Sequence, residues 1–251
     1  MVGDAVGVPE AERGCLLPFG NMLFNSFGPD NAVFRAAVQQ GQPVVQAISQ
    51  QCSREALTPD GLGAMFYAAA DEGRLAPELA PQLVRAFLSA GFDTTVSGLG
   101  NALFAFAAHP QQWQIFCDNP ALRARAFDEV IRWETPAQFF YRTTAQEVEL
   151  AGVRIPADEK VMMFLGSASR DPRRWHNPDG FDITRSSVGH VAFGSGLHIC
   201  ISQMLARMEA ELIFTAFARA VARFELAGTP VPRPNNTLRV LQSLPLRVVA
   251  R

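Results

Sequence analysis

A single cysteine, Cys200, lies between a glycine-bearing loop and a helical pattern, and its sulfur is the side chain best placed to do chemistry. The loop reads Phe193-Gly-Ser-Gly-Leu-His-Ile-Cys200, and apolar residues recur at helical spacing over 201–211. Gly194 and Gly196 would let the backbone turn tightly and approach a flat cofactor. We expect the cysteine in the first turn of the helix, because a helix N-terminus stabilises an anion such as a thiolate.

The cysteine has two interpretations, of which the first is a metal-binding thiolate. It can be an axial ligand of a haem iron, where it pushes electron density toward the metal and favours O–O cleavage. His198, two residues before the sulfur, would then suit a haem propionate. Arg142, isolated in an apolar run after Phe139-Phe140-Tyr141, needs an anionic partner, which a cofactor carboxylate would supply. Alternatively, the cysteine is a small buried hydrophobe, the commoner role of a lone cysteine near a helix start.

A polar stretch interrupts a long apolar helix that we predict over 81–108. The stretch Ala90-Gly91-Phe92-Asp93-Thr94-Thr95 combines a glycine, an acid and two β-branched hydroxyls, which are unfavourable inside a buried helix. A hydroxyl there can bond back to an i−4 carbonyl and open the helix. An opened groove could hold O₂ and water, to which Asp93 and Thr94 could relay protons. The alternative is a satisfied polar spot in a core helix.

An acid and a base stand three residues apart on the helix that we predict over 121–133. These residues, Glu129 and Arg132, place opposite charges on one helix face. Such a pair is usually a surface pair that contributes about 0.2–0.5 kcal/mol. By itself, therefore, the spacing indicates only a modest structural role.

The composition limits the class of protein. Of the 251 residues, 48% are hydrophobic and 18% are charged, and the net charge of −2 gives no indication of binding to nucleic acid or to an anionic membrane. No run approaches the roughly 18 uncharged apolar residues of a membrane span. The four cysteines are widely spaced, and the start of the chain lacks the pattern of a signal peptide. We therefore expect a cytoplasmic protein without a disulfide framework.

The elements outside the helices are small. Residues 139–164 read as short strands and hairpins, and short apolar runs after 222 read as further strands. Residues 170–190 have no clear period and are expected to form a long irregular meander. The chain is thus predicted to be mainly α with small β-sheets, in a single domain over 1–251.

Taken together and in this order, the motifs resemble those of the cytochromes P-450. The stretch 90–95 resembles the oxygen-activation groove of the family's central helix, and 193–200 resembles its haem loop. The pair at 129 and 132 resembles its structural Glu–Arg pair. Segment 171–185 resembles its meander, which would make Arg185 a third member of that network. The resemblance implies the C-terminal part of the cytochrome P-450 fold, from about helix F to the C-terminus.

The resemblance also implies the cofactor and the residues that serve it. Cys200 would ligate the iron of haem b, iron protoporphyrin IX, while Asp93 and Thr94 would deliver protons. Glu129 and Arg132, with Arg185, would fix the meander. The residues expected to contact the cofactor are Cys200, His198, Arg142, Ala90, Gly91, Phe193, Gly194 and Gly196.

Within the family, the chain resembles soluble bacterial members that oxidise para-substituted benzoic acids. Its reaction would be hydroxylation or O-demethylation of an aromatic carboxylic acid with O₂, and electrons would come from NAD(P)H through a reductase and a ferredoxin. A narrow aromatic slot would bind the flat substrate by apolar burial; the alternative for each phenylalanine is ordinary core packing. The residues implied for this slot are Phe24, Phe27, Ser89, Ala90, Ala137 and Phe140.

Two features depart from the family pattern. Ser202 stands where the family normally has glycine, and its side chain is expected to loosen haem binding or to shift the electronics of the thiolate. The chain also resembles only roughly the last three-fifths of a family member, with the N-terminal part absent. The apolar helix over 81–108 would then be partly exposed, which predicts weak stability or self-association. The alternative function is therefore a truncated, catalytically inactive remnant, either haem-binding or inert.

Overall fold

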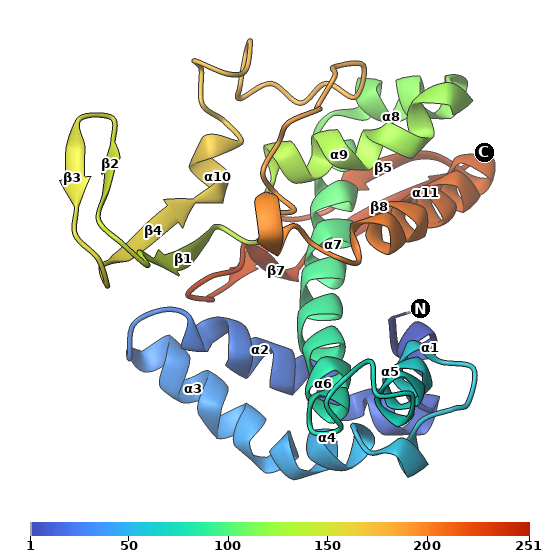
Figure 1. Ribbon diagram of the computed structural model, residues 1–251. Coiled ribbons are helices and arrows are strands. Elements are labelled where there is room, and N and C mark those ends of the chain that lie inside the picture. Colours follow the sequence, from blue (N-terminus) through green and yellow to red (C-terminus); the bar gives the residue numbers. More distant parts are fainter. Residues whose placement is uncertain (1) are drawn as a thin grey trace. The chain divides into compact units, whose positions relative to one another are not determined.

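The computed structural model describes residues 2–251, which fall into two units (Figure 1). Unit 1 comprises the residues up to Leu99 together with Arg233–Val240. Unit 2 comprises Gly100–Pro232 together with Leu241–Arg251. The prediction of a mainly α chain with small β-sheets is confirmed, whereas the single domain over 1–251 stays a prediction.

Unit 1 is built from helices that bury one apolar face each. Its core contains aliphatic side chains with at most 1% exposure, among them Val6, Ile48, Val84 and Leu88. Val84 and Leu88 are four residues apart and so share the buried face of their helix. In chain order the elements are α1 (Val2–Val6), η1 (Glu10–Cys15), α2 (Leu16–Ser26), α3 (Ala32–Gly41), η2 (Gln42–Val44), α4 (Val45–Gln51), η3 (Arg54–Ala56), α5 (Leu62–Asp71), α6 (Leu79–Gly91) and the first part of α7 (Asp93–Ala108).

The helix predicted over 81–108 is two helices in the structure. α6 starts before the predicted position and ends at Gly91, and α7 begins at Asp93. The Thr94 hydroxyl donates to the Ala90 carbonyl at 2.6 Å. This is the back-bonding to an i−4 carbonyl that bends or opens helices. The break between α6 and α7 therefore agrees with the alternative in which the polar stretch opens the helix, while a groove that holds O₂ and water stays a prediction.

Unit 2 combines helices with four small ladders of strands. Its core is aromatic: the Phe106 ring packs against the rings of Trp113 (5.2 Å between centroids), Phe116 (5.4 Å), Phe181 (5.9 Å) and Phe214 (5.4 Å). The elements after α7 are α8 (Pro110–Asp118), η4 (Pro120–Leu122), α9 (Arg123–Trp133), β1 (Phe139–Thr143), β2 (Val148–Leu150), β3 (Val153–Ile155), β4 (Lys160–Phe164), α10 (Leu165–Ala168), η5 (Gly196–His198), α11 (Gln203–Ala220), β5 (Val221–Leu226), β6 (Val231–Arg233), β7 (Val240–Ser243) and β8 (Leu246–Ala250).

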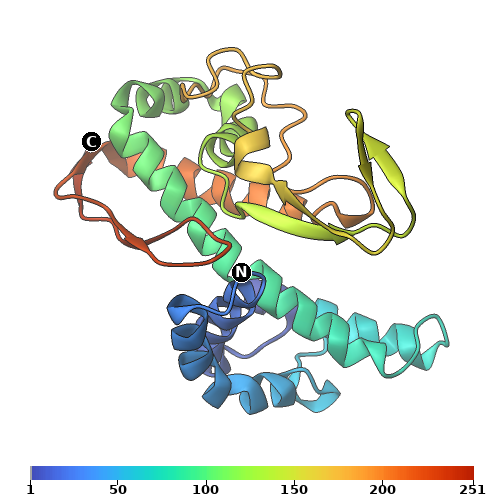
Figure 2. The ribbon, with the colours of Figure 1, turned by 90° about the vertical axis from the view of Figure 1, so that its left-hand side faces the viewer.

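The strands form two-stranded ladders, and the pairings of β1, β2 and β5 are antiparallel. β1 pairs with β4, β2 with β3, and β5 with β8, while β6 and β7 form the fourth ladder. The β2–β3 turn uses Ala151 and Gly152, both at positive φ (50° and 79°), which suits the twist of a hairpin. Figure 2 shows this hairpin standing away from the rest of its unit, and five of its six strand residues are exposed.

The segment between α10 and η5 has neither helix nor strand over the described residues 169–195. This confirms the irregular meander predicted over 170–190. A separate observation concerns membranes: across residues 2–251, no helix combines the length and apolar character needed to span a bilayer.

Candidate functional site

The loop that carries Cys200 closes on itself through one backbone hydrogen bond. The Cys200 N–H donates to the Phe193 carbonyl at 2.7 Å. Gly194 lies at φ +75°, and a Cβ added there would meet the His198 carbonyl oxygen at 2.9 Å. A side chain at this position would therefore be strained by both the backbone conformation and the close contact, so the loop requires this glycine.

Cys200 precedes the helix rather than lying in its first turn. α11 begins at Gln203 with Ser202 as its N-cap, so the predicted position of the cysteine in the first turn is wrong. The reason is local: Ile199 is extended, with φ −57° and ψ 139°, so the chain is not yet helical when it reaches the cysteine. The favourable field of the helix N-terminus falls off within about one turn and therefore acts on the sulfur less directly.

The Cys200 sulfur lies 3.5 Å from the Ser202 hydroxyl oxygen. The apolar residues that flank it along the chain, Leu197, Ile199 and Ile201, are all exposed. No group of three or more His, Cys, Asp or Glu side chains suited to a metal ion occurs within residues 2–251. A single sulfur fits the axial ligand of a haem iron, since such a cofactor supplies the remaining iron ligands itself.

Both basic residues predicted for cofactor carboxylates lie in unit 2. His198 ends the short helix η5 and is exposed. Arg142 lies on β1 opposite Val161, and its Nη1 donates to the Tyr141 carbonyl at 2.8 Å. Within the described part of the chain, no carboxylate pairs with Arg142. These two side chains therefore have no competing acid among the described residues.

Asp93, the predicted proton-delivery acid, is fully buried in unit 1 and bound by an arginine. The Nη2 of Arg233 donates to both carboxylate oxygens, at 2.9 and 3.0 Å. Burial raises the pKa of Asp93 above its usual range, although Arg233 opposes this by its charge and its hydrogen bonds. Sequence reasoning missed Arg233: a buried acid calls for a cation, but nothing local points to a residue 140 positions away.

The neighbours of Asp93 in the polar stretch have different environments. Gly91 is buried, and an added Cβ would lie 2.8 Å from a methyl carbon of Val2. Ala90 is exposed, and Thr94 is half-buried with its hydroxyl bonded to the Ala90 carbonyl. Gly91 therefore serves helix packing within unit 1.

The Glu129–Arg132 pair is buried, so the surface pair suggested by its spacing alone is wrong. Arg132 binds Glu129 through two parallel hydrogen bonds, Nε to Oε2 at 2.7 Å and Nη2 to Oε1 at 2.8 Å. It also donates to the meander carbonyls of Ser169 (3.0 Å), Pro178 (2.8 Å) and Gly180 (2.9 Å). One guanidinium thus ties a helix to a segment that has no secondary structure of its own.

Glu129 receives further donors from the same meander. The backbone N–H of Asp182 donates to its Oε1 at 3.0 Å, and the Ser187 hydroxyl donates to its Oε2 at 2.7 Å. Arg185 forms an ion pair with Glu129, with Nε 3.3 Å from Oε1. Glu129, Arg132 and Arg185 are therefore brought together, and Ser187 is a member that sequence reasoning missed, because no spacing distinguishes it from other serines.

The six residues implied for the substrate are divided between the units. In unit 1, the rings of Phe24 and Phe27 meet edge to face with centroids 6.1 Å apart, and Phe27 is exposed. Ser89 is buried and its hydroxyl donates to the Arg85 carbonyl at 2.8 Å. In unit 2, Ala137 is buried and Phe140 is half-buried on β1.

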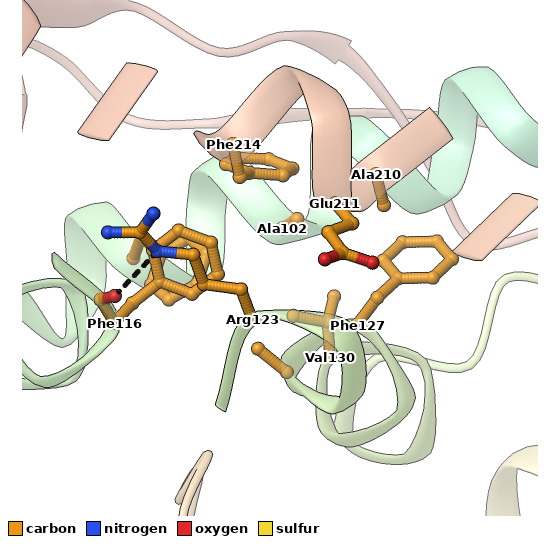
Figure 3. A pocket seen from close by; sticks show the side chains of 10 residues that line it. Ala102, Phe116, Arg123, Phe127, Val130, Ala210, Glu211 and Phe214 are labelled. Atoms are coloured by element: carbon orange, nitrogen blue, oxygen red, sulfur yellow. Dashed lines mark hydrogen bonds between the residues drawn. The ribbon is translucent and has the colours of Figure 1, made fainter. Parts of the chain in front are cut away.

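A cavity lies between helices α7, α8, α9 and α11 of unit 2 (Figure 3). Its volume of about 10 Å³ suffices for roughly one water molecule. Its lining includes Ala102, Phe106, Phe127 and Phe214, and the Nε of Arg123 at its edge donates to the Phe116 carbonyl at 3.3 Å. This cavity is a gap in the packing of the core and is too small for an organic substrate.

Comparisons with known proteins point to one family. The family model described as cytochrome P-450 matches residues 121–248. The cytochrome P-450 CYP199A2 of Rhodopseudomonas palustris is 48% identical over 245 residues, which cover 98% of this chain and 60% of that protein. Cytochrome P-450 107B1 of Saccharopolyspora erythraea is 33% identical and is covered to 61% of its length.

Solved structures give the same result. The cytochrome P-450 CREJ in complex with (4-ethylphenyl) dihydrogen phosphate has a TM-score of 0.89 at 26% identity, over 98% of this chain and 63% of that one. CalO2 has a TM-score of 0.86 at 27% identity, over 99% of this chain and 64% of that one. The chain spans about three-fifths of the length of the curated relatives that it matches. With the family model matching half of its residues, the chain belongs to the cytochrome P-450 superfamily and corresponds to the C-terminal part of that fold.

Proposed function

We propose that this chain carries the haem-ligating part of a monooxygenase and that Cys200 is the axial thiolate ligand. The observation that supports this best is the geometry of its loop. A glycine at positive φ permits the backbone bond that closes the loop, and the apolar residues next to the cysteine in the sequence are exposed. When bound, haem b supplies activation of O₂ and insertion of one oxygen atom into a C–H bond.

The chain's own residues would hold the cofactor and manage protons. His198 and Arg142 are proposed to hold its carboxylates, since both can donate hydrogen bonds and neither has an acid partner in the described chain. The backbone at Ala90, Gly91, Phe193, Gly194 and Gly196 is proposed to approach the ring closely. Asp93 and Thr94 are proposed to relay protons at the carboxyl and hydroxyl groups, which lie at the opening between α6 and α7.

The proposed substrate class is an aromatic carboxylic acid, with para-substituted benzoates hydroxylated or O-demethylated. Support comes from the resemblance of the chain's motifs to bacterial members of the family that oxidise such acids, together with the aromatic pair Phe24 and Phe27. Ser89, Ala90, Ala137 and Phe140 are the other proposed contacts. Electrons are proposed to reach the site from NAD(P)H through a reductase and a ferredoxin.

The test is the absorbance of the reduced, CO-treated protein after expression with a haem supply. Thiolate ligation predicts a strongly red-shifted Soret band that is lost in the Cys200→Ala variant. Cys117→Ser is the matched control, since Cys117 is also half-buried and lies in the same unit. Haem uptake that is unchanged in Cys200→Ala would contradict the assignment of the ligand.

A second candidate function is a haem-binding or inert protein without turnover. It is favoured by a stripe of exposed apolar side chains on α11, namely Met204, Met208 and Leu212, at spacings of four residues. Exposed stripes of this kind reduce stability or promote self-association. Turnover of 4-methoxybenzoate with added redox partners separates the two candidates, because only the first predicts a demethylated product.

A further inference from the structure

Three side chains outside the site described above form a connected cluster against Phe193, at the start of the cysteine loop. Asp128 lies on α9, Arg207 on α11, and His190 just before the loop. The Arg207 Nε donates to Asp128 Oδ1 at 2.8 Å, and His190 Nε2 lies 3.2 Å from the same oxygen. The Arg207 guanidinium carbon lies 4.7 Å from the centre of the Phe193 ring. All four residues belong to unit 2.

The hydrogen bonds fix the protonation pattern of the cluster. The N–H of Ala192 donates to His190 Nδ1 at 3.2 Å, so the other ring nitrogen, Nε2, carries the proton and donates to Asp128. Burial opposes ionisation of Asp128, but the hydrogen bonds from His190 and Arg207 bring its pKa below the usual range. The cluster is therefore a carboxylate held between two donors.

Contacts continue from this cluster to the proposed iron ligand. Arg207 stacks on the Phe193 ring, and the carbonyl of that phenylalanine accepts the N–H of Cys200 at 2.7 Å. Arg207 also donates through Nη1 to Gln203 Oε1 at 2.8 Å, and Gln203 is the first residue of α11. The same guanidinium thus contacts the residue that accepts the Cys200 N–H and the start of the helix that follows the sulfur.

Shielding strengthens these contacts relative to a surface ion pair. The side chains of Arg207 and Asp128 are only 24% and 21% exposed, and His190 is 6% exposed. The planar guanidinium can stack on a ring and bind a carboxylate at the same time, which an ammonium group cannot do in the same geometry.

We propose that Asp128, His190 and Arg207 are positioning residues that hold Phe193 and, through its carbonyl, the backbone of Cys200. The effect on the loop backbone depends only on the contacts above. The effect on haem ligation rests on the proposed function. None of the three residues is proposed to touch the cofactor.

The test measures hydrogen exchange of the Cys200 amide in the full chain, because that N–H makes the bond that the cluster supports. Arg207→Gln is expected to speed its exchange about tenfold, the order expected when a partly shielded charge-assisted contact is lost. Arg207→Lys keeps the charge but loses the planar face, so it is expected to give a smaller acceleration. Arg219→Gln is the matched control, because Arg219 is exposed on the same helix.

Two results would overturn the proposal. One is a Cys200 amide that exchanges at the wild-type rate in both Arg207 variants. The other is acceleration spread evenly over unit 2, which would show only a general loss of stability. Asp128→Asn keeps the shape of the side chain but removes its charge, and it must reproduce the local acceleration at Cys200.

A haem-loaded sample separates this proposal from the proposed function. If Cys200 ligates haem, Arg207→Gln is expected to shift or split the reduced-CO Soret band, while Arg219→Gln leaves it unchanged. If the wild-type chain takes up no haem but the Cys200 amide still responds to Arg207→Gln, the proposed function fails and the positioning cluster stands.

Discussion

Two buried carboxylates of this chain differ in how completely they are bound. Glu129 in unit 2 receives two donors from Arg132, a backbone N–H and the Ser187 hydroxyl, and it also pairs with Arg185. Asp93 in unit 1 receives one nitrogen of Arg233, whose own Nε is buried and has no hydrogen-bond partner. Both acids have 0% exposure, so the difference lies in their partners and not in their access to water.

The difference indicates two distinct uses of a buried acid. Glu129 accepts hydrogen bonds from a helix residue and from two meander residues, so its role is to hold the meander on α9. Asp93 is bound through a single nitrogen, and burial raises its pKa although Arg233 opposes the rise. This supports a structural role for the first acid and the proposed proton relay for the second.

The largest expected effect comes from removing the cation that holds the meander. Arg132→Met leaves Glu129 buried without its main partner and frees three meander carbonyls. Breaking a buried pair in this way costs about 3–5 kcal/mol in the free energy of unfolding. Urea unfolding followed by tryptophan fluorescence measures it, because all three tryptophans of the chain lie in unit 2. The control Arg125→Met, at an exposed position on the same helix, should change the free energy of unfolding little. Equal losses in the two variants would show that the buried position of Arg132 does not cause its effect.

A smaller, pH-dependent effect is expected at Asp93. Arg233→Gln removes its partner and should cost about 1–3 kcal/mol at pH 7, less than a fully buried pair because Arg233 is partly exposed. Without the guanidinium, the raised pKa of Asp93 rises further. Relative to wild type, the loss of stability therefore appears as the pH rises through the folded pKa of wild-type Asp93, which burial holds above its usual value. It vanishes at lower pH, where the acid is protonated in both folded proteins.

Thermal melts of the full chain at pH 7 and pH 3.5, followed by circular dichroism, measure this dependence. Arg35→Gln provides the comparison within unit 1, since the Arg35–Asp30 pair is exposed and is expected to matter little at either pH. A loss in Arg233→Gln that stays the same at both pH values would show that the charge of Asp93 is not its cause.

The smallest expected effect comes from removing one of the several donors to Glu129. Ser187→Ala removes one of several donors to this carboxylate, so the remaining donors keep the charge bound. The expected loss is about 1 kcal/mol or less, measured by the same urea unfolding. A loss as large as that of Arg132→Met would show that the donors act together and not separately.

Local chemistry predicted several features correctly because their causes are local. The glycines before Cys200 lie at positive φ in the turn that they form, and the Thr94 hydroxyl bonds to the Ala90 carbonyl where the helix is broken. The position of the cysteine was predicted wrongly, since the extended Ile199 delays the start of α11 by a few residues. Where the helix starts depends on how the preceding loop closes, and the spacing of residues along the sequence does not describe that.

By itself, the sequence determined the mainly helical class, the family of the chain and the residues that bear chemistry, because propensity, periodicity and motif order are properties of neighbours along the chain. Only the tertiary structure decided which charges meet. It paired Asp93 with Arg233, buried Glu129 among donors from the meander, and joined Asp128 to His190 and Arg207. The physical reason is that a buried charge must find its partner in space, and no spacing along the chain records which distant residue the fold brings to it.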